Sequence, residues 1–313
     1  MFWRSDIDPG KEPYRVLLKR GGLIDEARDG RRVPFKVYHP EAEIDAPIVF
    51  WSHGLGGSAD GASFLSRFIA AHGYIVVNIT HVGTDSSMWE GKPGHPWDVI
   101  RATPLARDVV LNRFRDVPYL LDSLPDWLKQ HEDIKARADF SCTGMSGHSF
   151  GALTTQVMAG LLFPDENDRP QSFKDDRFKA GILYSPVPVA HLTDLAAEDL
   201  YRAIDLPLLF MTGTADQSPI EGFGMKERLA VYEHAGMKEK YLLMIEDADH
   251  MVFAGSRGKL TGYAKIPLHE TIIKVAALAW WDAWLKNDEA ARAWLQGGID
   301  GWLGEEAEFT RPA

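Results

Sequence analysis

A serine flanked by glycines two residues away on each side is the strongest chemical signal in the chain. Residues 147–151 read Gly-His-Ser-Phe-Gly, with Ser149 at the centre. An apolar stretch, 140–145, precedes this motif, and a helical pattern, 152–162, follows it. A nucleophile elbow requires this order, because the serine must stand on a sharp turn where a strand and a helix close on each other. We therefore predict that Ser149 is a nucleophile and not part of an ordinary strand-to-helix turn.

A serine hydroxyl reacts when a base takes its proton and an acid orients that base. Asp216 follows the apolar run 207–211, and His250 follows the run 241–245. Loops at the carboxyl ends of parallel strands meet at one edge of a sheet, so we predict that Ser149, Asp216 and His250 form a catalytic triad. Asp216 could otherwise be a turn aspartate that caps the next helix.

Four other aspartates compete for the role of the acid. Asp247 and Asp249 are nearer to His250 in sequence, but such close neighbours rarely point a carboxylate at the imidazole. Asp194 and Asp205 lie in a segment from which only an unusual geometry would reach the histidine. Asp216 is therefore the preferred acid.

The triad needs two N–H donors for the oxyanion of the tetrahedral intermediate. The first is the backbone N–H of Phe150, which directly follows the nucleophile. The second should come from residues 52–58, Ser-His-Gly-Leu-Gly-Gly-Ser, where three glycines let the backbone approach a substrate. We assign this donor to Leu55, with Gly54 or Gly56 as alternatives.

Short apolar runs predict the sheet that positions these residues. They occur without alternation, as parallel strands covered on both faces require, at 48–51, 74–79, 140–145, 180–184, 207–211 and 241–245. The intervening segments long enough for crossover helices are 60–72, 104–131, 150–162, 221–236 and 267–286. Strands near 22–27 and 32–39 should form an antiparallel hairpin. We predict one domain, 1–313, with a doubly wound, mostly parallel α/β sheet of about eight strands.

Four segments do not fit the alternation of strands and helices. Residues 1–20 are polar and mixed, which predicts a loosely attached arm, and 287–313 form a C-terminal extension. Residues 187–205 carry apolar side chains near helical spacing and predict a short helical insert or a small cap. Trp89 and Trp97 lie in the Gly- and Pro-rich segment 85–103, which faces the same side of the sheet as Ser149. They could line an acyl or aryl pocket or pack beneath their own loop.

Three further histidines are assigned no chemistry. His53 should bond its own loop, and His148 should point away from the substrate. His81 and Asp85 have the spacing of a ligand pair, but no third or fourth ligand lies nearby. We therefore expect neither a metal nor a cofactor.

The composition limits the partners and the compartment. The net charge of −11 argues against nucleic acid and anionic membrane surfaces. One cysteine, Cys142, allows no intrachain disulfide and should be buried in its strand. No basic segment followed by an apolar run opens the chain, and no run approaches the ~20 apolar residues of a membrane span, so we expect a cytoplasmic protein. The sequence does not indicate an oligomeric state.

Three motifs together resemble the α/β-hydrolase superfamily: residues 50–57, 71–77 and 147–151. They are most similar to dienelactone-hydrolase-like and platelet-activating-factor-acetylhydrolase-like esterases, and also resemble bacterial polyester hydrolases. The likeness runs from about residue 20 to 285. It implies the α/β-hydrolase fold and the same triad and oxyanion donors as above. True dienelactone hydrolases carry a cysteine at the elbow, so the serine of this chain argues against that activity.

These features predict a cofactor-independent serine hydrolase that cleaves short-acyl or small carboxylic esters through an acyl-enzyme. Acyltransferases, thioesterases and amidases use the same residues and remain alternatives. A non-catalytic scaffold that binds a ligand is an alternative of another class. The segments 85–103 and 187–205 are too short to form the large cover of an interfacially activated lipase, which favours small substrates.

Overall fold

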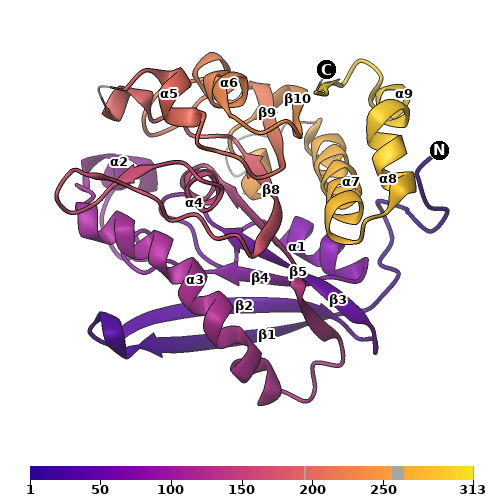
Figure 1. The fold of residues 1–313 in the computed structure, drawn as a ribbon, viewed down its shortest axis with the longest axis horizontal. Helices are drawn as coiled ribbons and strands as arrows, with labels where there is room; N and C mark the ends of the chain where they lie inside the picture. The colour runs from indigo at the N-terminus through magenta and orange to yellow at the C-terminus, as the bar shows by residue number, and fades with distance from the viewer. Residues whose placement is uncertain (194, 256–263, 313) are drawn as a thin grey trace.

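A nine-stranded sheet runs through the molecule (Figure 1). The computed structural model describes residues 1–193, 195–255 and 264–312. In these ranges the strand order is β1-β2-β4-β3-β5-β8-β9-β10-β11, and the six strands from β4 to β10 in this order are parallel. The prediction of a mostly parallel α/β sheet with an antiparallel start is confirmed. The predicted count of about eight strands is wrong.

Apart from β4, the parallel strands are longer than the apolar runs that predict them. The main sheet contains β1 (Val16–Asp25), β2 (Arg31–Pro40), β3 (Asp45–Ser52), β4 (Ile75–Ile79), β5 (Arg137–His148), β8 (Phe178–Tyr184), β9 (Leu208–Ala215), β10 (Lys240–Asp249) and β11 (Ala307–Thr310). A separate two-stranded hairpin is formed by β6 (Phe163–Pro164) and β7 (Pro170–Gln171). Cys142 lies in the earlier part of β5 and is half-buried, so the expectation of a buried thiol is wrong.

The ninth strand comes from the C-terminal extension. β11 pairs antiparallel with β10, from Leu242 opposite Thr310 to Ile245 opposite Ala307. At the other edge, β1 begins at Val16, inside the segment predicted as an arm, and pairs along its whole length with β2. β1 and β11 form the two edges of the sheet, and short apolar runs in the sequence do not predict their pairing.

Helices cover both faces of the sheet, and strand residues alternate between two apolar layers. The layer that contains Val49 and Trp51 packs against α1 (Ser63–Ala71), α7 (Ile266–Leu285), α8 (Glu289–Ala293), η5 (Trp294–Gly298) and α9 (Ile299–Leu303). The layer that contains Phe50 packs against α3 (Arg107–Lys129), α4 (Phe150–Met158), α5 (Ala197–Tyr201) and α6 (Met225–His234). Each of the five predicted crossover segments therefore contains a helix.

Two segments depart from expectation. Residues 85–103, expected as a loop, contain the 3₁₀ turn η2 (Ser86–Met88) and α2 (Pro96–Ala102). The first residues are packed and not loose, because the Trp3 indole donates to Asp282 (3.0 Å) and packs at a tilt against the Trp294 ring. In the predicted insert 187–205, η3 (Ala190–Leu192) and α5 are short helices, and Asp194 lies outside the described residues.

The order of the strands opens a crevice at one edge of the sheet. The chain passes from β3 to β4 in one direction and then crosses back to place β5 on the other side of β3. The loops after β3 and β5 therefore leave the sheet in opposite directions, and ligand sites of α/β sheets form at such a point. These loops carry residues 52–58 and Ser149.

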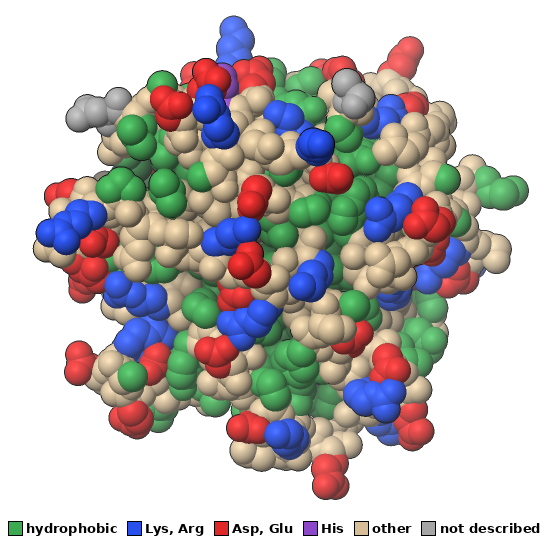
Figure 2. Space-filling view, in the orientation of Figure 1, with side chains coloured by type: hydrophobic (Ala, Val, Ile, Leu, Met, Phe, Trp, Pro, Cys, Tyr) green, Lys and Arg blue, Asp and Glu red, His purple; other side chains and the backbone are tan. Residues whose placement is uncertain are grey.

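Positive and negative side chains are mixed on one face of the molecule. On the face seen in Figure 2, Lys and Arg side chains are interspersed with Asp and Glu. Within the described ranges, no helix combines the length and the apolar character that crossing a membrane would require.

Candidate active site

Ser149 stands on a strained turn between β5 and α4. Its φ of 53° and ψ of −119° lie outside the regions that non-glycine residues prefer. Its N–H donates to the Tyr184 carbonyl (2.9 Å), which anchors the turn to β8. A Cβ added to Gly151 would overlap the Ser52 carbonyl, and one added to Gly147 would overlap the Gly151 carbonyl. The two glycines are therefore required because main chain touches main chain here.

Asp216 and His250 are brought together at the ends of β9 and β10. The His250 Nδ1–H donates to Asp216 Oδ1 (2.7 Å), and the Thr212 hydroxyl donates to Asp216 Oδ2 (2.9 Å). Burial by itself raises the pKa of the Asp216 carboxyl. The hydrogen bond from His250 and the charges of His250 and Arg228 outweigh burial and lower that pKa to about 2. Asp216 is therefore ionised at neutral pH.

The competing aspartates in the described ranges are engaged elsewhere. Asp249 Oδ1 accepts the N–H groups of Met251 and Val252, as a helix cap does. Asp247 pairs with Lys265 (3.1 Å), and Asp205 pairs with Lys174 (3.0 Å). Asp194 lies outside the described residues. The histidine therefore has Asp216 as its carboxylate partner in this part of the chain.

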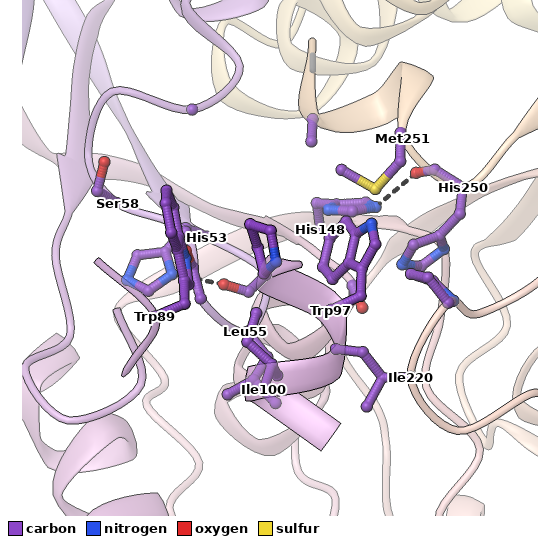
Figure 3. A pocket seen from close by; sticks show the side chains of 18 of the residues that line it. His53, Leu55, Ser58, Trp89, Trp97, Ile100, His148, Ile220, His250 and Met251 are labelled. Atoms are coloured by element: carbon purple, nitrogen blue, oxygen red, sulfur yellow. Dashed lines mark hydrogen bonds between the residues drawn. The ribbon is translucent and has the colours of Figure 1, made fainter. Parts of the chain in front are cut away.

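Ser149 and His250 line one cavity of about 420 Å³ (Figure 3). Trp89 and Trp97, from the segment 85–103, line the same cavity. None of the described residues of 187–205 does so, which places the helical insert away from Ser149. The polar contacts of the His250 ring are to Asp216 and Arg228, and none joins it to the Ser149 hydroxyl within the described ranges. In enzymes without substrate such hydrogen bonds are often long.

The backbone after β3 leaves few choices for an oxyanion donor. The Gly56 N–H donates to the Thr84 carbonyl (2.9 Å), and the Gly57 N–H donates to the Gly54 carbonyl (3.0 Å). The N–H of Gly56 is therefore engaged elsewhere, and Leu55 stays the assigned donor with Gly54 as the alternative. Phe150 is the first residue of α4, where a helix has no internal partner for its N–H.

His53 fastens this loop from within. Its Nδ1–H donates to the Gly54 carbonyl (2.7 Å), and its Nε2 accepts the His81 N–H (3.0 Å). Burial, reinforced by the charge of Arg113, holds the pKa of His53 well below its usual range. The neutral ring thus bonds its own loop, as the sequence indicated.

Arg113, which the sequence analysis missed, holds the same loop from below. Its buried guanidinium donates to the Ser52 hydroxyl (2.8 Å) and to the His53 carbonyl. It also donates to the hydroxyls of Thr84 and Thr154 (both 2.8 Å), and the latter lies on α4. One side chain therefore joins the loop after β3 to the helix that carries Phe150. The signal in the sequence is a charged residue, Arg113, on the apolar face of the helix predicted within 104–131.

His148 does not point away from the site, so that prediction is wrong. It lines the cavity, and its ring centroid lies 4.6 Å from that of His250 (Figure 3). Its Nε2–H donates to the His250 carbonyl (2.8 Å), a buried acceptor that the sequence could not place beside it. Burial keeps the pKa of His148 well below its usual range, so the ring is neutral.

The site offers chemistry from side chains and backbone. In the described ranges, no group of three or more His, Cys, Asp and Glu residues could hold a metal ion. His81 instead contacts Ser52 and Asp116.

Comparison of the chain with models of known protein families and with curated proteins finds no match. A strained serine, a carboxylate-bound histidine and N–H groups at a helix start are the parts required for nucleophilic attack on an acyl carbon.

The close backbone contact at Gly151 predicts that an added methyl group there strongly destabilises the fold. Gly151→Ala should lower the free energy of unfolding by about 2–3 kcal/mol or more, because the added Cβ would overlap the carbonyls of Ser52 and His53, which the packed backbone holds in place. Gly301→Ala is the matched control, since it also lies in a helix but has no neighbouring atom within 4 Å of the added Cβ. It should be neutral or stabilise by up to ~1 kcal/mol. Denaturant unfolding measures both, and equal effects would contradict the close approach.

Proposed function

We propose that this protein is a serine carboxylic-ester hydrolase that acts on short-acyl or small esters through an acyl-enzyme. The observation that carries the proposal is the 2.7 Å hydrogen bond between His250 and Asp216 beside the cavity that Ser149 lines. The order Ser149, Asp216, His250 after β5, β9 and β10 supports the further proposal that the fold is that of the α/β-hydrolases.

The mechanism assigns one role to each part. Ser149 Oγ attacks the acyl carbon, and His250 Nε2 takes its proton. The N–H groups of Leu55 and Phe150 bind the negative oxygen of the tetrahedral intermediate. The alcohol leaves with the proton from His250, and a water molecule then cleaves the acyl-enzyme by the same steps. Asp216 keeps the proton on Nδ1 and stabilises the imidazolium that forms.

The cavity wall supports a neutral, apolar substrate. Trp89, Trp97, Ile100, Ile220 and Met251 are among its lining residues. In the described ranges no Asp, Glu, Lys or Arg lines it, so a charged acyl group would lose its hydration without gaining a partner. Acyl transfer, thioester and amide cleavage would use the same residues, and analysis of the products separates them.

Removing the nucleophile tests the proposal directly. Ser149→Ala should lower kcat on a p-nitrophenyl ester by on the order of 10⁶-fold and abolish labelling by a fluorophosphonate. Stability should change little, because Ser149 occupies a strained turn and fills no part of the core. Residual activity within tenfold of wild type would contradict the assignment of Ser149 as the nucleophile. A wild-type protein with neither burst nor labelling would favour the ligand-binding scaffold.

The acid is tested by a change that keeps its shape. Asp216→Asn should preserve the fold and cost on the order of 10⁴ in kcat, because the histidine would then adopt the wrong tautomer. Asp247→Asn is the control, since this half-exposed carboxylate pairs with Lys265. If Asp247→Asn abolishes activity and Asp216→Asn does not, the acid follows β10 and not β9, and the assignment of Asp216 is wrong.

The size of the cavity predicts the preferred acyl length. Each added methylene should gain at most ~0.8 kcal/mol while it still meets apolar wall, so kcat/KM should peak at roughly two to six acyl carbons. No jump in rate should appear as the substrate passes its solubility limit. A series of p-nitrophenyl esters measures this. A preference for long-chain triglyceride with such a jump would contradict this prediction and favour a role of segment 85–103 as a lid.

A further inference from the structure

Arg228, on α6, contacts both members of the acid–base pair. Its side chain is fully buried, with Nε 3.1 Å from Asp216 Oδ1 and Nη2 3.0 Å from His250 Nδ1. Its Nη1 donates to the carbonyls of Pro186 (2.8 Å) and Ser185 (3.2 Å), in the turn after β8. The guanidinium therefore joins α6, the turn after β8 and the loop after β9 at the pair.

The protons on the three groups can be assigned from the distances. A carboxylate oxygen 2.7 Å from His250 Nδ1 requires the proton on Nδ1, which then donates to Asp216. Nδ1 therefore has no lone pair for the Nη2 of Arg228, and two donors face each other at 3.0 Å. This contact becomes a repulsion between two cations when the imidazole gains a second proton.

We propose that Arg228 is a positioning residue that sets the charge balance of the pair, and this inference rests on the proposed function. Its guanidinium pairs with Asp216 and holds the carboxylate toward Nδ1. It also places a positive charge 3.0 Å from His250 Nδ1, where it opposes the charge of the imidazolium. Arg228 touches no reacting atom and acts through the acid and the base.

The other titratable groups around His250 do not duplicate this effect. His148, from β5, is held neutral by burial and donates to the His250 carbonyl. Asp249, the preceding residue, accepts backbone N–H groups. Glu221 accepts the Ser218 hydroxyl, and Glu227 accepts the Gly224 N–H. In the described ranges, Arg228 is the charged cation in contact with the imidazole.

A purely structural role would look different. The two carbonyl bonds could make Arg228 a brace, and its loss would then lower stability and leave the pH dependence of catalysis unchanged. A charge-setting role makes the pH profile move, because removing a nearby cation stabilises the imidazolium. The imidazole would then stay protonated to higher pH, and the acidic limb of kcat/KM would shift upward.

The test compares Arg228→Gln, Arg228→Lys and the control Lys226→Gln, an exposed cation on the same helix. Arg228→Gln should move the acidic limb of kcat/KM to higher pH by about 0.5 unit or more. It should also lower kcat by roughly ten- to a hundredfold at unchanged KM, because the carboxylate loses its support. Arg228→Lys should restore the limb but not the full kcat, and the control should match wild type.

Two results would overturn the proposal. One is an acidic limb in Arg228→Gln that coincides with wild type. If the neutral variant does not fold, Arg228→Lys decides, because the single nitrogen of an ammonium cannot occupy the positions of both Nε, beside Asp216, and Nη1, beside the two carbonyls. Wild-type kcat in that variant is the second such result.

Failure of the proposed function is distinguishable. It appears as a wild-type protein that is not labelled by a fluorophosphonate. The NMR signals of the His250 ring then provide the test. The pH at which these signals change should still be higher in Arg228→Gln than in wild type.

Discussion

The site depends on a backbone-to-backbone contact among the end of β3, the turn after β5 and the start of α4. Gly151 lies so close to the Ser52 carbonyl that no side chain fits between them. Because main chain touches main chain, the position of the Ser149 backbone does not depend on the packing of flexible side chains. The strain at Ser149 persists because the packed strands and helix around it determine its conformation.

Two buried arginines extend this constraint into the charged part of the site. Arg113 reaches the loop after β3 from α3, and Arg228 reaches the Asp216–His250 pair from α6. Each also donates to main-chain carbonyl oxygen, and Arg228 pairs in addition with the Asp216 carboxylate. Burying a guanidinium costs less when such partners satisfy its donors. Losing one partner of such a group is costly, so these contacts hold the loops in one arrangement.

Local sequence signals predicted what depends on local structure. The sequence predicts Ser149 because the motif, the strand and the helix adjoin, and it predicts Asp216 and His250 because each follows an apolar strand. The strand β11 was missed because its partner β10 lies about sixty residues earlier and edge pairing needs only four residues. The contact of Arg228 was missed for a related reason, since tertiary packing alone brings α6 to the pair.

The wall of the cavity shows why chemistry is easier to infer than substrate. The Trp89 indole lines the cavity and also donates to the Gly56 carbonyl (2.7 Å), next to Leu55. A Cβ on Gly56 would press against the same ring and against Ile100. The substrate wall and the assigned oxyanion loop are therefore one packed unit. A change in segment 85–103 would alter the fit of the substrate and the position of the donor together, which no separate inspection of the two segments can reveal.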